Sequence, residues 1–186
     1  MAMWSCVTWS GRSRWPATRN RGRTLNQAKA KTRVRPLRWL KSTSNRTFIA
    51  WPIALFAVEA LLQQGWPVIH LWALPLLAWG YLQYRWVGRL RTREGGGGPG
   101  IAVPPDRIVR AGPYRWVRNP MYLGHLIFFA GLALALGSWI GAIVFAVHAV
   151  WFDRRVREDE ERLAGLFGDD YRDYCRRVKR WIPGIL

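Results

Sequence analysis

The stretch FIAWPIALFAVEALLQ, residues 48–63, is almost entirely apolar or aromatic. Further apolar segments follow it along the chain at residues 66–87, 121–136 and 139–152. A helix needs about 20 mainly apolar residues to cross the hydrocarbon core of a bilayer, and its backbone must form its hydrogen bonds internally there. The short turns at Gln64-Gly65 and Gly137-Ser138 join the segments in pairs. The sequence therefore predicts an all-α integral membrane protein with about four transmembrane helices, arranged as two hairpins.

Basic residues are absent from the two short turns. The chain has 186 residues, half of them hydrophobic, and a formal net charge of +18. Twelve Lys or Arg side chains fall in residues 1–47, seven in residues 88–119 and nine after residue 152. Such a charge suggests a nucleic acid or an anionic membrane as partner, and the long apolar runs favour the membrane. Because positively charged loops stay in the cytoplasm, we expect both termini and the long connection on that side.

The chain divides into a basic N-terminal extension, residues 1–47, and a membrane domain, residues 48–186. No helical or strand period organises the extension, and its composition favours a poorly ordered cytoplasmic segment over a tail that binds RNA or anionic lipid. In the membrane domain we expect a first hairpin, a cytoplasmic connection, a second hairpin and a C-terminal cytoplasmic amphipathic helix. These occupy residues 48–87, 88–119, 120–152 and 153–186 in that order.

The cytoplasmic connection contains Glu94-Gly-Gly-Gly-Gly-Pro-Gly100. This run lacks the Lys-Ser/Thr ending of a phosphate-binding loop, so it indicates a flexible linker. Cys6 and Cys175 have no metal-ligand spacing. Neither a metal site nor a disulfide framework is expected.

A helix is expected to begin at Asn119-Pro120, just before the third apolar segment. Asn is a favoured N-cap residue, and Pro suits the first helical turn. The free amides of that helix start, together with Arg115 and Arg118, are suited to a carboxylate or a phosphate. Three aromatic residues could line a cleft for a planar ring, or they could form an interfacial anchor belt with the arginines: Tyr114, Trp116 and Tyr122.

An acidic run lies on a predicted helix near the C-terminus. The apolar residues that share one face of this helix are Phe152, Val156, Leu163 and Phe167. Asp159 and Glu160 fall in the same stripe. A carboxylate on a packed face needs a partner, because burial of an isolated charge is costly. The partner is either Arg115 or Arg118, or a cationic group of a ligand such as an amino group or a sulfonium.

These two stretches together resemble the isoprenylcysteine carboxyl methyltransferase and phospholipid methyltransferase superfamily of membrane enzymes. The resemblance covers residues 106–186, whereas residues 48–90 match only as two further membrane helices. Asn119 stands where lipid-modifying eukaryotic members have His. The motifs that carry the resemblance are Gly112-Pro-Tyr-Arg115, Arg118-Asn-Pro-Met-Tyr122, Asp159-Glu160, Phe167-Gly-Asp-Asp-Tyr171, Tyr174 and Lys179-Arg-Trp-Ile-Pro183.

The resemblance implies a methyltransferase that uses S-adenosylmethionine in a pocket on the cytoplasmic side of the membrane. The implied acceptor is lipophilic: an isoprenylcysteine-like carboxylate, a phospholipid amine or another small molecule that partitions into membranes. Asp159 or Glu160 would hold the amino group of the cofactor. The full set of residues implied to bind it is Gly112, Tyr114, Arg115, Arg118, Asn119, Pro120, Tyr122, Asp159 and Glu160.

Methyl transfer from a sulfonium depends mainly on holding donor and acceptor in line, so no nucleophilic side chain is required. An amine or phenol acceptor would benefit from a base, and the candidate catalytic residues are Glu160 and His125. His125 is expected one turn beyond Tyr122 on the same helical face. Other ionisable residues within the membrane segments are expected to form helix contacts rather than to act in catalysis: Glu59, His70 and His148.

Two other functions fit parts of the sequence. An NADPH-dependent sterol-type reductase looks similar in its C-terminal region, but the short chain and the four helices argue against it. A non-catalytic membrane protein whose basic tail binds lipid or RNA would depend on residues 1–47, whereas an enzyme would not. The partners expected are membrane lipids and a lipophilic small molecule, and no specific nucleic acid.

Overall fold

The computed structural model describes residues 42–97 and 104–182, and every regular element in these ranges is helical. The all-α prediction is therefore confirmed. Expectations for residues 1–41, which include most of the basic extension, lie outside the described residues. The elements in chain order are α2 (Thr43–Asn45), the π-helical turn η2 (Arg46–Ala50), α3 (Trp51–Leu62), the 3-10 turn η3 (Leu71–Ala73), α4 (Leu74–Gly95), the 3-10 turn η4 (Gly112–Arg115), α5 (Pro120–Leu136), α6 (Trp139–Phe167) and α7 (Asp169–Arg177).

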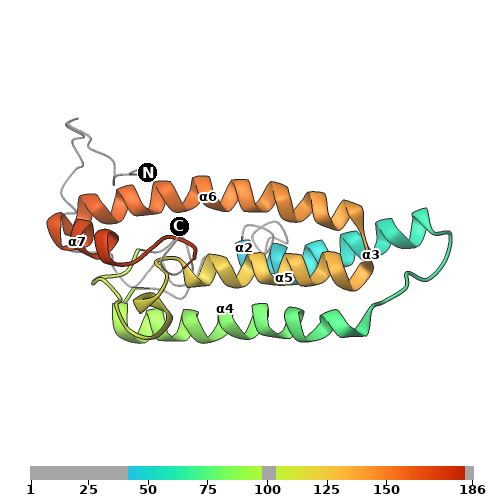
Figure 1. Cartoon of the computed structure of the whole chain (residues 1–186), viewed down its shortest axis with the longest axis horizontal. Helices are drawn as coiled ribbons and strands as arrows, with labels where there is room; N and C mark the ends of the chain where they lie inside the picture. Colours follow the sequence, from blue (N-terminus) through green and yellow to red (C-terminus); the bar gives the residue numbers. More distant parts are fainter. Residues whose placement is uncertain (1–41, 98–103, 183–186) are drawn as a thin grey trace, which may run out of the picture.

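Three long helices run side by side, with α5 between α4 and α6 (Figure 1). The most extensive helix contact is between α4 and α5. Glycines allow these two backbones to touch: a Cβ added to Gly80 would lie 2.5 Å from the backbone N of Phe128. A Cβ added to Gly124 would lie 3.0 Å from the backbone N of Tyr84. Small residues are typical of close helix contacts in membranes, and here they bring the first half of α4 against α5.

The first apolar segment forms one continuous helix from Thr43 to Leu62, which is long and apolar enough to cross a membrane. In the described part of the chain, α5 is a shorter apolar helix. The second segment departs from its predicted bounds. Residues 66–70 are not helical, and α4 continues past the predicted end at residue 87 to Gly95. Pro75 lies in the first turn of α4, where its missing N–H costs nothing, and this favours the late start.

Helix α6 continues without a break through residue 152, where the sequence predicts a boundary. The side chain of Ser138 caps its start by accepting a hydrogen bond from the Gly141 amide at 2.9 Å, and Gly168, with a φ of 58°, follows its end. Its 29 residues extend over about 44 Å, more than the hydrocarbon core of a bilayer. The prediction of a separate helix beginning at residue 153 is therefore wrong. That segment contains the charged second half of α6 and a short further helix, α7.

The glycine-rich run after α4 begins as a structured turn. Gly96 and Gly97 have φ values of 72° and 67°, which residues other than glycine rarely adopt. The Gly97 amide donates to Asp106 Oδ2 at 2.9 Å, and the Asp106 amide donates to the Gly95 carbonyl at 2.7 Å. The predicted flexible linker is thus ordered at its start, and residues 98–100 lie outside the described part.

Ionisable residues within the apolar helices mostly have structural partners. Glu59 is buried and accepts hydrogen bonds from Ser138 Oγ and from Gln63 Nε2. Nδ1 of His148 bonds to a carbonyl one turn earlier in α6, at 2.8 Å. These contacts agree with the structural roles expected for Glu59 and His148. His70 is exposed and contacts α5 through its backbone amide.

Candidate active site

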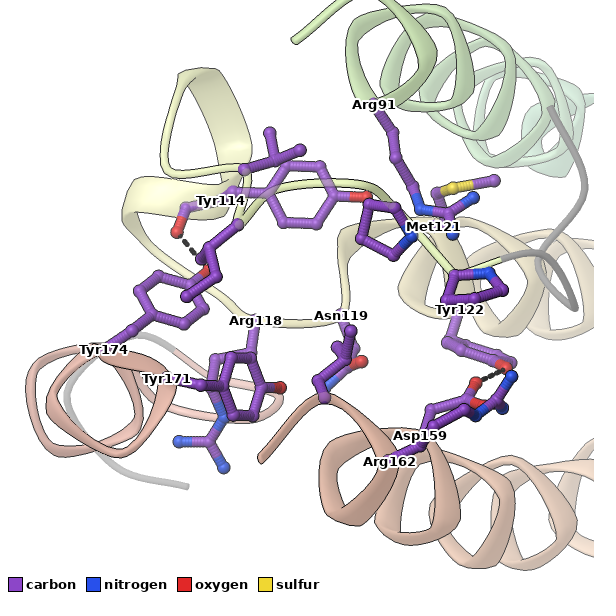
Figure 2. A pocket seen from close by; sticks show the side chains of 15 residues that line it. Arg91, Tyr114, Arg118, Asn119, Met121, Tyr122, Asp159, Arg162, Tyr171 and Tyr174 are labelled. Carbon is purple, nitrogen blue, oxygen red and sulfur yellow. Dashed lines mark hydrogen bonds and ion pairs between the residues drawn. The ribbon is translucent and has the colours of Figure 1, made fainter. Parts of the chain in front are cut away.

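A cleft lies at the end of the molecule where α7, the chain before α5 and the C-terminal end of α4 come together (Figure 1). Its empty volume, including the open mouth, is about 740 Å³. Residues from both of the motif-bearing stretches, the one before α5 and the acidic one near the C-terminus, line it. Figure 2 labels ten of its lining residues, Arg91, Tyr114, Arg118, Asn119, Met121, Tyr122, Asp159, Arg162, Tyr171 and Tyr174, and the others are Pro104, Pro105, Ile108, Val109 and Leu163.

The start of α5 forms one edge of the cleft. The helix begins at Pro120, as predicted, and Asn119 occupies the N-cap position with φ −124° and ψ 51°. The Asn119 side chain does not cap the helix, because its Nδ2 donates to Glu160 Oε1 at 3.1 Å instead. The first hydrogen bond of the helix joins the Leu123 amide to the Asn119 carbonyl at 3.1 Å. The amides of Met121 and Tyr122 therefore precede the hydrogen-bonded ladder, beside the cleft that both residues line.

Two arginines and an asparagine bind one carboxylate beside the cleft. We call this group the ionic network: Arg118, Asn119, Glu160 and Arg180. Arg118 Nε donates to Glu160 Oε1 at 2.9 Å, and its Nη2 donates to Oε2 at 3.2 Å. Arg180 Nη2 donates to the same Oε2 at 2.8 Å. The side chains of Arg118 and Glu160 are only 9% and 8% exposed. The Glu160 carboxylate is thus bound by three side chains of this protein.

The two arginines set the charge state of Glu160. Burial alone would raise the pKa of this carboxyl, but the hydrogen bonds from Arg180 and Arg118 outweigh it and lower the pKa below its ordinary value of 4.5. Burial likewise opposes ionisation of Arg118, and the bonded Glu160 more than offsets this, so the pKa of Arg118 is raised. Both groups are charged at neutral pH. An ion-paired carboxylate with a lowered pKa is a poor proton acceptor.

Arg118 also ties the C-terminal segment to the start of α5. Its Nη1 donates to the carbonyls of Cys175 and Val178 at 3.0 and 2.6 Å. Its backbone amide donates to the Lys179 carbonyl at 2.9 Å, in a parallel bridge between Val117 and Lys179. One arginine therefore fixes α7 and the segment that follows it against the residues that begin α5.

Asp159 has different surroundings, although it precedes Glu160 directly. It lines the cleft, and its Oδ2 accepts a hydrogen bond from Tyr122 Oη at 2.6 Å (Figure 2). Its Oδ1 pairs with Arg162 and lies 3.9 Å from Arg155 Nε. The Asp159 side chain is 14% exposed, and that of Arg162 is 37% exposed. This carboxylate is therefore on the cleft wall, beside two partly exposed arginines.

Tyrosines form the opposite side of the cleft. Tyr174 Oη donates to the backbone carbonyl of Tyr114 at 2.7 Å, which joins α7 to η4 (Figure 2). Burial raises the pKa of Tyr114, Tyr171 and Tyr174 above the ordinary value for a phenol. Their hydroxyls remain protonated at neutral pH. These residues thus offer flat apolar rings and hydrogen-bond donors rather than bases.

The structure divides the predicted site residues into two groups. Those that line the cleft are Tyr114, Arg118, Asn119, Tyr122 and Asp159. Those that do not are Gly112, Arg115, Pro120, Glu160 and His125. Gly112 has a φ of 57° and begins η4, Arg115 is exposed, and Pro120 is buried in the first turn of α5.

His125 lies apart from the cleft, among aromatic rings of three elements. Its ring stacks against Phe48 of η2 and Phe152 of α6, with centroids 4.9 and 5.5 Å away, and Tyr84 of α4 lies at 4.7 Å. It is fully buried, and neither ring nitrogen has a hydrogen-bond partner in the described part of the chain. Tyr122, one turn earlier, directs its hydroxyl to Asp159 instead. The two side chains therefore diverge, although they share one helical face.

Some lining residues were not predicted. Tyr171 and Tyr174 belong to a motif quoted above, so their spacing was a usable signal. Arg91 was counted only as a basic residue of the connection, yet it is buried near the end of α4 and lines the cleft. Met121, Arg162 and Leu163 flank predicted site residues. Their place in the cleft follows from the helical turn that carries Tyr122 and Asp159.

Comparison with known proteins covers the same part of the chain. Residues 100–170 match the phospholipid methyltransferase family. This matched segment, which is less than half of the chain, is similar to that family. An 80-residue segment is 34% identical to the protein-S-isoprenylcysteine O-methyltransferase of Schizosaccharomyces pombe, and it covers 42% of this chain and 34% of that protein. Over 81 residues the chain is 38% identical to protein-S-isoprenylcysteine O-methyltransferase B of Arabidopsis thaliana, covering 42% of this chain and 41% of that protein.

A third relative has a different named acceptor. Methanethiol S-methyltransferase 1 of Bradyrhizobium diazoefficiens is 34% identical over 85 residues, which cover 45% of this chain and 29% of that protein. The chain thus spans between 29% and 41% of the length of these three relatives. The predicted resemblance to this membrane-embedded family is confirmed. The three relatives named here are all methyltransferases. Their acceptors differ, so the family does not fix the substrate of this chain.

Proposed function

We propose that the chain binds S-adenosylmethionine in the cleft and transfers its methyl group to a lipophilic acceptor. The observation that carries this proposal is a carboxylate, Asp159, in one cleft with the unbonded amides that begin α5 and a wall of tyrosines. The match of residues 100–170 to a methyltransferase family and the methyltransferase relatives support S-adenosylmethionine as the cofactor. Because those relatives have different acceptors, the proposal names only a lipophilic class.

The donor set of the cleft fits the cofactor. S-adenosylmethionine has cationic amino and sulfonium groups, and Asp159 offers a carboxylate to one of them. Its own carboxylate is suited to the amides of Met121 and Tyr122, at the partly positive start of α5. Its adenine ring is planar and suits the apolar faces of Tyr114 and Tyr171.

The residues of this chain act mainly by position. When bound, S-adenosylmethionine supplies an electrophilic methyl group, whose transfer needs an acceptor held in line. Tyr122 fixes Asp159 through a 2.6 Å hydrogen bond, so the carboxylate has one orientation toward the cleft. Arg162 pairs with Asp159 and is the more exposed of the two, so a cationic ligand can replace it at this carboxylate. An acceptor that is nucleophilic at neutral pH suits this site, because the tyrosines stay protonated.

Of the two acidic residues, we assign the cofactor contact to Asp159 and a positioning role to Glu160. Glu160 accepts hydrogen bonds from Arg118, Asn119 and Arg180, which leaves it little capacity for a ligand. Arg118 and Asn119 in turn line the cleft. Glu160 therefore supports the cleft from behind, and His125 has no assigned role in the reaction.

The membrane placement is part of this proposal. Four helical stretches would cross the bilayer: residues 43–62, α4, α5 and the first half of α6. Their outer surfaces expose many large apolar side chains, which soluble proteins rarely do over such an area, for example Ile53, Leu61, Trp79, Leu82, Ile143 and Val147. Basic side chains gather at the cleft end, while residues 63–70 and 137–138 at the other end carry no Lys or Arg. The cleft and both termini are proposed to face the cytoplasm.

A transfer assay tests the function. The purified full chain in nanodiscs is incubated with methyl-tritiated S-adenosylmethionine and total membrane lipid extract, and label in the organic phase is counted. We expect labelled lipid with the wild type and at least about tenfold less with Asp159→Asn, because the loss of a charged contact costs about 1.4 kcal/mol or more. Glu161→Gln is the matched control, since this exposed neighbour does not line the cleft.

The outcomes separate the candidate functions. If Asp159→Asn labels as much lipid as the wild type does, the proposal that the cleft binds the cofactor through Asp159 is wrong. Absence of both cofactor binding and labelled lipid would contradict the methyltransferase function. Oxidation of NADPH with a panel of sterols, without methyl transfer, would favour a sterol-type reductase instead.

A further inference from the structure

A second hollow lies on the surface of α4, outside the cleft. Its empty volume, including the open mouth, is about 750 Å³, and in the described part of the chain it shares no lining residue with the cleft. We call it the α4 groove, and its lining residues are Tyr84, Arg85, Gly88, Arg89, Thr92 and Arg93. They recur every four residues, so they form two adjacent rows along one face of the helix. Gly88 lies in the row with Tyr84 and Thr92, and a Cβ added to it would lie 3.5 Å from Met121 Cε of α5.

One row of the α4 groove is cationic. Arg85, Arg89 and Arg93 are exposed. Arg93 pairs with Glu94 at 3.4 Å, but both side chains are exposed, and such surface pairs are weak. Within the described residues, Arg85 and Arg89 have no acidic partner. Three guanidinium groups one turn apart match the oxygens of a phosphate, which they can bind in a bidentate way.

The same helix is apolar just before this row. Trp79, Leu82 and Trp86 are each more than half exposed. Trp side chains concentrate where a membrane helix passes from the hydrocarbon core to the head groups. The surface of α4 therefore changes from apolar to cationic near residue 85. A ligand that covers both parts must carry a negative charge next to long apolar chains.

From this juxtaposition we propose that the α4 groove binds the head group of an anionic phospholipid. The phosphate contacts the arginine row, and the acyl chains lie along Trp79, Leu82 and Trp86. A nucleic acid or a soluble phosphate would satisfy the arginines and leave these apolar side chains in water, which favours a lipid. This inference rests on the proposed membrane placement of α4, and it is independent of the identity of the cofactor.

Lipid binding can be measured on the purified full chain in a neutral detergent, with fluorescent phosphatidylglycerol as the probe. We expect binding at least about tenfold tighter than that of the matching phosphatidylcholine probe. The variant Arg85→Gln/Arg89→Gln is expected to weaken phosphatidylglycerol binding about tenfold or more, since it removes two of the three positive charges that contact the phosphate. The control Arg154→Gln/Arg177→Gln removes the same charge from exposed positions elsewhere. It is expected to bind as the wild type does.

Three results would overturn the inference. One is equal binding by the wild type and Arg85→Gln/Arg89→Gln, and another is an equal loss in the control variant. The third is competition by glycerol 3-phosphate at the concentration at which phosphatidylglycerol competes, which would identify a free phosphate as the ligand. Thermal unfolding checks that each variant is folded, and the single variant Arg89→Gln replaces the double one if needed. Binding of S-adenosylmethionine is measured in parallel, so failure of the proposed function is seen separately.

Discussion

The cleft wall and the ionic network behind it each contain one carboxylate of the pair Asp159-Glu160, and they use it differently. Asp159 faces the cleft and is held by a tyrosine hydroxyl and by a partly exposed arginine. Glu160 is buried and bound by two arginines and an asparagine. One residue along a helix is a rotation of about 100°, which is enough to separate these surroundings. We propose that these neighbouring acidic residues divide ligand binding and structural support between them.

Loss of Glu160 is expected to have the largest effect on stability. In Glu160→Gln, the buried Arg118 and the half-buried Arg180 lose their counter-charge, and such a loss costs about 3 kcal/mol or more. Denaturant unfolding of the purified variant in detergent measures the change. Glu161→Gln, at an exposed position, is expected to stay within about 0.5 kcal/mol of the wild type. A loss below about 1 kcal/mol in Glu160→Gln would contradict the structural role of the network.

Loss of Asp159 is expected to change binding more than stability. Asp159→Asn keeps the shape of the side chain and removes its charge from the cleft wall, so the Kd for S-adenosylmethionine rises about tenfold or more. Isothermal titration calorimetry measures it. The free energy of unfolding is expected to fall less than in Glu160→Gln, because both arginines near Asp159 remain partly exposed. The opposite result would contradict these roles: a larger loss of cofactor binding in Glu160→Gln together with a larger loss of stability in Asp159→Asn.

The pH dependence of stability distinguishes the two sites further. Because the folded pKa of Glu160 is lowered, its contribution is fully present above its ordinary pKa of 4.5 and is lost as pH falls through the folded value. The difference in unfolding free energy between wild type and Glu160→Gln should therefore be constant at neutral pH and shrink in acid. Urea unfolding at a series of pH values measures this difference. A difference that grows as the pH falls would contradict the ion pairing of Glu160.

The smallest effect is expected at Arg115. This side chain is exposed and does not line the cleft, although sequence motifs grouped it with the binding residues. Arg115→Ala is expected to change stability by no more than about 0.5 kcal/mol and to leave the Kd for S-adenosylmethionine within about twofold. Thermal shift and calorimetry check both values. A large loss of binding would show that Arg115 reaches the cofactor.

The sequence predicted the features that depend on local pattern. The start of α5 at Pro120 follows from cap chemistry, and the buried face of α6 follows from the spacing of Phe152 and Val156. The separation of Asp159 from Glu160 could not be predicted, because it depends on Arg180 arriving from beyond α7. The position of His125 could not be predicted either, because the rings that contact it, those of Phe48 and Tyr84, come from distant parts of the chain.

Helix boundaries show where the apolar pattern was a poor guide. The sequence placed a boundary at residue 152 because the apolar run ends there. Residues 142–164 contain no Gly or Pro, and α6 continues through all of them. Conversely, residues 66–70 are apolar enough to be counted as helix, yet they precede η3 as irregular chain. Backbone-breaking residues would have predicted these boundaries better than hydropathy did.

Photolabelling tests the central claim, that the cleft binds S-adenosylmethionine, most directly. The purified full chain is irradiated with methyl-tritiated S-adenosylmethionine, with and without an excess of unlabelled cofactor, and the labelled peptides are mapped by mass spectrometry. The account predicts competed label in peptides that contain Tyr114, Tyr122 or Asp159. Competed label confined to peptides outside the cleft, or no competed label at all, would contradict it.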